Sequence, residues 1–205
     1  MKGLLLKDLY LTFKYCRAFI LIIAVFIGAS FINEHSAFLT VYPCLIVGMI
    51  PATLYSYDER EKWSIYSATL PVSRVQLVSA KYIIGLFSGA TIILLTAIVQ
   101  AFKMINTSFI LMNYLSVIAF VASICLVAPS VFMPFMFKYG AEKGRIIYYV
   151  VVGATCAAFI VFSVYQESTF ILNNTFVIIA VCISAAVIYI ASWLLSIAFY
   201  KKREI

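Results

Sequence analysis

The sequence predicts an all-α integral membrane protein with six transmembrane helices, and three observations lead to this fold class. The 205 residues are 65% hydrophobic and only 11% charged, whereas about a quarter of the residues in a soluble domain are charged. The hydrophobic residues are gathered in runs of membrane-spanning length. The basic residues lie between those runs on alternate sides. Since no hydrophilic stretch is long enough for a soluble domain, residues 1–205 are predicted to form a single membrane domain.

Residues 1–17 are predicted to form an amphipathic helix in the membrane interface. At 100° per residue, one arc holds the apolar residues Leu5, Leu6, Leu9, Tyr10 and Phe13. The charged residues Lys7, Asp8 and Lys14 point elsewhere. A cytoplasmic extension of the first span explains the same pattern equally well. No small-residue cleavage site follows, so a signal peptide is not expected.

Six apolar runs are long enough, or nearly long enough, to cross a bilayer. They lie at about residues 18–31, 37–57, 74–102, 114–137, 146–165 and 175–200. The first run is short for the ~20 residues that a bilayer needs, so this span is expected to include turns of the preceding helix.

The basic residues predict that both termini lie in the cytoplasm. Of the 15 lysines and arginines, every one but Lys103 falls in the segments that would be cytoplasmic if the N-terminus were inside. The positive-inside rule therefore fixes the orientation and favours an even number of spans. The net charge of +7 indicates anionic lipid head groups as partners rather than nucleic acid, because the basic residues flank the membrane.

Prolines and polar residues interrupt the predicted spans. A proline in a membrane helix is tolerated where neighbours or water satisfy the carbonyl that it frees. Static kinks explain these prolines, and so does a kinked helix that lines or gates a path. The candidates for a path or gate are Pro43, Pro51, Thr53, Ser88, Gln100, Pro129 and Pro134. Gly85 and Gly89 form a Gly-x-x-x-Gly contact motif.

A polar island between Tyr57 and Tyr82 is predicted to be a structured cytoplasmic loop. Asp58 is a candidate N-cap, and Glu61 three residues later completes a capping box, so a short helix is expected to begin there. Trp63, Tyr66 and Leu70 then fall on one face of that helix.

The same island contains the signals of a second helix. Pro71 is expected to end the first helix, because the residue before a proline is disfavoured in the α region. Ser73 can cap the next helix, with Gln76 reaching back to it. Residues 58–73 are either an ordinary structured loop or a docking element that a partner protein pushes on.

The spans carry little chemistry of their own. Lys81 lies near a helix end and is expected to snorkel to the surface. Proton-driven carriers place ionisable residues inside the membrane, whereas the span interiors here offer Ser, Thr, Gln100 and Tyr189. The five cysteines are unclustered, so we interpret them as small apolar residues rather than ligands or disulfide partners.

No catalytic, cofactor-binding or metal-binding residues are expected. The single histidine, His35, lies in a predicted external turn, and no His-Glu-x-x-His zinc motif is present. The chain also lacks a Gly-x-x-x-x-Gly-Lys-Ser/Thr nucleotide loop. Any ATP and Mg²⁺ must therefore be bound by a partner subunit.

The island resembles the cytoplasmic loop of small ABC-2 type transporter permeases. The residues that carry the likeness are Tyr57-Asp-Glu-Arg60, Trp63, Tyr66, Thr69-Leu-Pro-Val-Ser-Arg74 and Lys81-Tyr82. The opening Met1-Lys-Gly-Leu-Leu-Leu-Lys-Asp8 is similar to the elbow helix of that family, and Tyr200-Lys-Lys-Arg203 is similar to its basic tail. The resemblance implies that the loop is a coupling helix, which meets the ATPase through Asp58, Glu59, Arg60, Lys62, Trp63, Tyr66, Leu70 and Pro71.

The resemblance further implies a homodimer or heterodimer of permeases with two cytoplasmic ATPase subunits, in a bacterial cytoplasmic membrane. Within that family, the sequence resembles the permeases of exporters for cytolytic or antimicrobial peptides, such as phenol-soluble modulins. The implied activity is export of an amphipathic peptide. A lipid or drug exporter on the same scaffold and a non-transport assembly or immunity protein are the alternatives.

Overall fold

The chain folds into long α-helices. The computed structural model describes residues 2–32, 37–69, 71–106, 111–144, 146–147, 149–150, 153–154, 157 and 175–202. Within these ranges there is no strand, which confirms the predicted all-α class. The helices are α1 (Lys2–Tyr15), α2 (Arg17–Ile32), α3 (Ala37–Arg60), α4 (Trp63–Ala68), α5 (Arg74–Asn106), α6 (Leu111–Tyr139) and α8 (Thr175–Lys202).

Four of these helices, α3, α5, α6 and α8, are long and apolar enough to cross a membrane. The pair α1 and α2 is bent by 68° and supplies a fifth candidate if the two helices form one span. The 16 residues of α2 are fewer than the ~20 that a bilayer needs. The predicted span at residues 146–165 lies largely outside the described residues, so the six-span topology stays a prediction.

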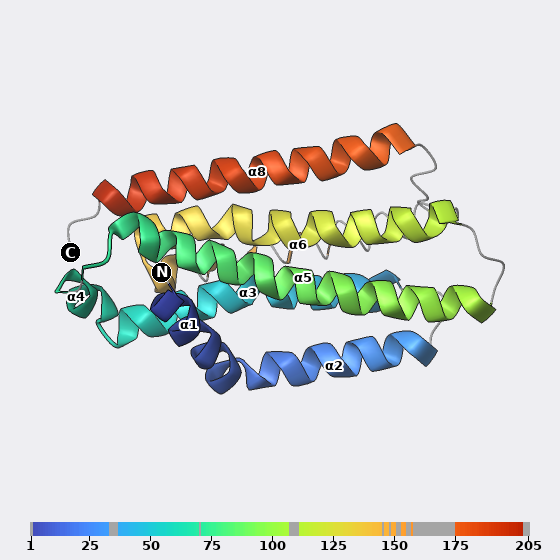
Figure 1. Cartoon of the computed structure of the whole chain (residues 1–205), viewed down its shortest axis with the longest axis horizontal. Coiled ribbons are helices and arrows are strands. Elements are labelled where there is room, and N and C mark those ends of the chain that lie inside the picture. The colour runs from blue at the N-terminus through green and yellow to red at the C-terminus, as the bar shows by residue number, and fades with distance from the viewer. Residues whose placement is uncertain are drawn as a thin grey trace.

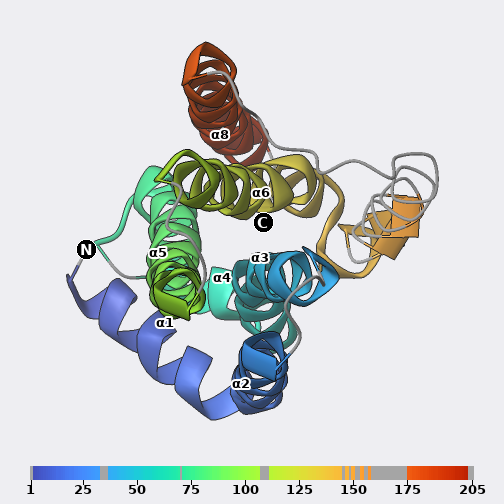
Figure 2. The same ribbon diagram turned by 90° about the vertical axis from the view of Figure 1, so that its right-hand side faces the viewer.

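The long helices run side by side (Figure 1), with α3 in the middle of the bundle and α8 on its outside (Figure 2). Helix α3 contacts α2, α5 and α6, whereas α8 contacts α6 and α5. Helix α1 crosses the bundle at the end where α4 and the C-terminal end of α8 also lie (Figure 1). The cytoplasmic location of this end stays a prediction from the basic residues.

The Gly-x-x-x-Gly motif packs α5 against its neighbours in the same chain. A Cβ atom on Gly85 would lie 3.5 Å from Pro51 of α3 and 3.5 Å from the hydroxyl of Tyr189 on α8, and one on Gly89 would lie 3.6 Å from Cys125 of α6. These small residues therefore let α5 approach three helices at once.

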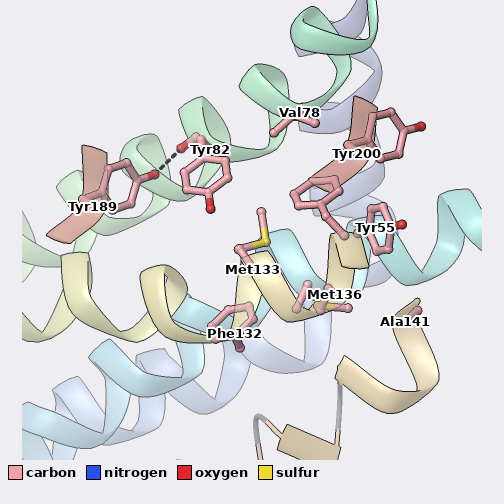
Figure 3. Close-up of a cluster of buried hydrophobic side chains, with 11 residues drawn as sticks. Tyr55, Val78, Tyr82, Phe132, Met133, Met136, Ala141, Tyr189 and Tyr200 are labelled. Carbon is pink, nitrogen blue, oxygen red and sulfur yellow. Dashed lines mark hydrogen bonds between the residues drawn. The ribbon is translucent and has the colours of Figure 1, made fainter. Parts of the chain in front are cut away.

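Hydroxyl groups connect α5, α6 and α8 beside a cluster of buried hydrophobic side chains, in which the hydroxyl of Tyr189 donates to the carbonyl of Tyr82 at 2.7 Å (Figure 3). Ser192 Oγ donates to the carbonyl of Ser130 at 2.7 Å, which is the carbonyl that Pro134 frees four residues later. The hydroxyl of Tyr82 lies 2.8 Å from Ser192 Oγ and 2.7 Å from Ser196 Oγ. Since each hydroxyl has one hydrogen, Tyr82 donates to Ser192 and accepts from Ser196. A neighbouring helix thus satisfies the proline's orphan carbonyl, as the membrane requires.

Candidate functional site

The polar island begins as the end of a long helix, not as a new one. Helix α3 continues to Arg60, and the amide of Glu61 donates to the carbonyl of Tyr57 at 3.0 Å. The prediction that Asp58 caps a helix was therefore wrong. The chain turns at Glu61 and Lys62, where Lys62 has a φ of 52° in the left-handed region. Asp58 stays helical because its side chain is bound to other helices, as described below.

Helix α4 is six residues long and lies at the end of the bundle (Figure 1). Its outward residues are Ile65 and Tyr66, which are 60% and 57% exposed. Trp63 is half-buried, and its ring lies 5.3 Å from that of Tyr66. The structure thus places Trp63 and Tyr66 on one face, while Leu70, the third residue of the predicted stripe, lies outside the described residues.

Four charged residues form a cluster where α1, α3 and α5 meet. We call Lys7, Asp8, Asp58 and Lys81 the charge cluster. Lys81 Nζ lies 2.9 Å from Asp8 Oδ1 and 2.5 Å from Asp58 Oδ2. Lys7 Nζ lies 2.8 Å from Asp58 Oδ1 and 3.2 Å from Asp8 Oδ1. Each cation therefore contacts both anions.

The charge cluster corrects the expectation that Lys81 snorkels to the surface. Lys81 is 5% exposed and Asp8 is 1% exposed. A buried charge is tolerated when it is paired and hydrogen-bonded, and α1 supplies the pairing carboxylate by crossing α5. Removing one member of a buried pair leaves an uncompensated charge. The cluster therefore fixes the relative positions of three helices.

Glu59 makes a second contact from the end of α3. Its Oε2 accepts a hydrogen bond of 2.6 Å from the amide of Ala141. This amide follows Gly140, whose φ of 90° ends α6 in a conformation that favours glycine. Of the charged residues predicted to meet an ATPase, Asp58 and Glu59 bind within the chain, whereas Arg60 and Lys62 are exposed.

The second half of the island contains the capping box that the sequence predicts. The amide of Gln76 donates to Ser73 Oγ at 3.3 Å, and the amide of Ser73 donates to Gln76 Oε1 at 3.2 Å. Pro71 is exposed and lies between α4 and α5. Arg74 Nη1 donates to the carbonyl of Lys201 at 3.0 Å, which joins the start of α5 to the end of α8.

The candidates for a path or gate lie within the packed bundle. Pro43, Pro51, Pro129 and Pro134 are buried. The hydroxyls of Thr53 and Ser88 donate to carbonyls of their own helices at 2.9 and 3.0 Å. Gln100 lines a cavity of about 10 Å³ between α2, α3 and α5, which has room for about one water molecule. Within one copy these residues pack helices together, and their part in a path stays a prediction.

A family model described as ABC-2 family transporter protein matches residues 3–201. The chain belongs to this family. The match confirms the resemblance to ABC-2 permeases and covers nearly the whole sequence. No curated protein and no solved structure gave a match.

Membership identifies the chain as a multi-pass membrane subunit of a transporter and implies an ABC ATPase as its partner. Among the described residues of this permease, no three His, Cys, Asp or Glu side chains come together in a way that could hold a metal ion.

Proposed function

We propose that this permease is the membrane subunit of an exporter in a bacterial cytoplasmic membrane, and that a separate ATPase docks on α4. The observation that carries the proposal is the exposed pair Ile65 and Tyr66 at the end of the bundle. Exposed charged residues, Arg60, Glu61 and Lys62, lie beside this pair. An apolar anchor with a polar rim is the usual anatomy of a protein interface. The ATPase subunit would bind the ATP and Mg²⁺.

The transport path is proposed to lie between two permease copies, or between this chain and a paralogue. Two features of the described residues support this placement. The polar candidates Thr53 and Ser88 bond to their own helices, and the cavity at Gln100 has the size of a water molecule. These two features support a passage for a peptide that is formed by surfaces of more than one copy.

An amphipathic peptide is the proposed substrate. The outward face of α5 is apolar along most of its length and also presents the exposed hydroxyl residue Thr91. The large residues exposed on this face are Leu86, Phe87, Leu94, Leu95, Ile98 and Phe102. Such a face suits the apolar side of a helical peptide.

Reconstitution of the permease with its ATPase in liposomes tests the substrate. Amphipathic helical peptides should stimulate ATP turnover and accumulate on the side opposite the ATPase. Transport of lipids or small drugs without peptides would leave the exporter assignment standing and refute the peptide assignment.

Alanine substitution of the exposed pair tests the docking site. The double variant Ile65→Ala, Tyr66→Ala should weaken binding of the ATPase. Truncating a residue that anchors a protein interface typically costs about 2 kcal/mol or more of binding free energy. Ile183→Ala is the matched control, since Ile183 is 58% exposed on α8. Equal ATPase binding by the double variant and the control would refute docking through this pair.

A further inference from the structure

The ammonium group of Lys7 on α1 contacts both a side chain of α4 and the two carboxylates of the charge cluster. Its Nζ lies 4.0 Å from the centroid of the Trp63 ring, within the range of a cation–π contact. The same atom lies 2.8 Å from Asp58 Oδ1 and 3.2 Å from Asp8 Oδ1. A residue of the N-terminal helix therefore joins the proposed docking helix to the helices of the bundle.

We propose that Lys7 is a positioning residue, which holds α4 in place through Trp63 and passes its movement to α1 and α5. This proposal rests on the proposed function, in which α4 receives the ATPase. It assigns to α1 a part in coupling ATP turnover to transport.

Helix α4 is held to the bundle by side chains, among them the buried Ser67, rather than by its backbone. The only described helix that its backbone approaches is α3, to which it is connected by the turn at Glu61 and Lys62. A helix of six residues is too short to be stable alone in water. Its orientation therefore depends on side-chain contacts, among them that of Lys7 with Trp63, whose ring also lies 5.3 Å from that of Tyr66.

The indole nitrogen of Trp63 indicates what holds this ring. It is buried and has no hydrogen-bond partner among the described residues. A buried indole N–H normally finds a partner, so hydrogen bonding does not explain why Trp63 is turned toward the bundle. The ammonium of Lys7 over the ring does, because it attracts the electron-rich face.

The other end of the connection is rigid. Asp8 and Lys81 are 1% and 5% exposed, so moving either one alone would separate a buried charge from one of its two partners. A displacement of Trp63 that carries Lys7 must therefore move the charge cluster as a unit. Helix α1 contacts α5, α3 and α2, so the displacement reaches three helices at the end of the bundle (Figure 1).

Tryptophan fluorescence of the permease alone tests the contact. The chain has two tryptophans, so Trp193→Phe leaves Trp63 as the only one. In this background Lys7→Met keeps an unbranched apolar side chain and removes the ammonium. We expect a red-shifted emission and stronger quenching by acrylamide, because Trp63 is released into water.

Lys14→Met is the matched control, because Lys14 lies on the same helix with its Nζ 5.3 Å from the centroid of the Tyr15 ring. This variant should leave the fluorescence of Trp63 unchanged, and Lys7→Arg should restore it, since a guanidinium also stacks on indole. Unchanged quenching in Lys7→Met, or the same increase in Lys14→Met, would overturn the assignment of Lys7.

The complex with the ATPase tests the consequence. Lys7→Met should lower the number of substrate molecules moved per ATP about fivefold or more, the range of a typical coupling energy, while basal ATP turnover persists. Lys7→Arg should recover most of that ratio. A ratio equal to that of the unsubstituted permease would overturn the proposal.

The two measurements separate this proposal from the function on which it rests. If no ATPase binds to α4, the proposed function fails, although the fluorescence of Lys7→Met still reports the contact. If the ATPase binds and drives transport equally well in Lys7→Met, the proposed function stands and the role of Lys7 is refuted.

Discussion

The charge cluster gives the sharpest test of how the bundle is held together. Lys81→Met removes the cation that contacts both Asp8 Oδ1 and Asp58 Oδ2. Methionine fills much of the volume of the lysine stem, so little packing is lost. The two carboxylates would then share Lys7 as the remaining cation of the cluster, and the net charge of the cluster would change from zero to −1.

The size of the effect follows from burial. Removing one partner of a buried ion pair typically lowers the free energy of unfolding by about 3–5 kcal/mol. Because Lys7 still contacts both carboxylates, we expect a loss at the lower end, about 3 kcal/mol. For a chain of this length, each 1 kcal/mol shifts the melting temperature by about 2–4 °C. The expected shift is therefore about 6–12 °C.

A double variant separates burial of charge from loss of a helix contact. Asp8→Leu with Lys81→Met replaces the pair by apolar side chains and leaves Asp58 paired with Lys7. Replacing a buried pair in this way is often neutral or stabilising, so the double variant should be more stable than Lys81→Met alone.

Thermal unfolding in nanodiscs measures both variants, with Lys14→Met as the exposed control. A shift of less than about 2 °C for Lys81→Met, within the ±0.5 kcal/mol of ordinary surface changes, would contradict the buried ion pair. A double variant that is less stable than Lys81→Met would contradict the explanation by unpaired charge.

Three further predictions concern other contacts. Glu59→Gln should lower the free energy of unfolding by about 1 kcal/mol, because it weakens the charge-assisted hydrogen bond to the amide of Ala141. Thermal unfolding measures this loss. Ser192→Ala should cost about 1–3 kcal/mol, since the carbonyl freed by Pro134 loses its donor. Ser184→Ala, which removes an exposed bond within α8, should change the same melting temperature little. Single cysteines on a cysteine-free background should react with an external reagent at positions 35, 106 and 173 and not at 62, 141 and 203. One clear reversal would contradict the predicted orientation.

The sequence predicted the long helices well, because apolar runs bounded by polar residues leave few alternatives in a membrane. The start of α5 was predicted from Ser73 and Gln76, which make a local signal that needs no knowledge of the fold. Asp58 gave an equally good local signal and misled us. Its carboxylate binds Lys7 and Lys81 from distant parts of the chain, and this tertiary contact keeps Asp58 inside α3.

The charge cluster could not be predicted from any one segment. Asp8 and Lys81 are separated by 73 residues, and each has an ordinary explanation alone, as a polar residue of an interfacial helix and as a snorkelling lysine. The available signal was an acid and a base that each lie among apolar residues near a predicted cytoplasmic end. Two such residues of opposite sign are candidates for pairing, although the sequence does not give the angle at which α1 crosses α5.

The pairing of Asp8 with Lys81 determines which face of α1 is turned toward the bundle. The periodicity had placed Leu5, Leu6, Leu9, Tyr10 and Phe13 on the apolar arc. Of these, Leu5 and Leu9 pack against the core, whereas Leu6, Tyr10 and Phe13 are 67%, 68% and 63% exposed. The buried face of α1 instead holds Leu4, Asp8 and Thr12. A helix that turns its charge inward and its aromatic residues outward would be unstable in water, because the apolar face loses the gain of burial. The same helix is stable where lipid covers the outer face. The 68° bend between α1 and α2 shows that α1 does not continue α2 in a straight line, and its place in the membrane interface stays a prediction.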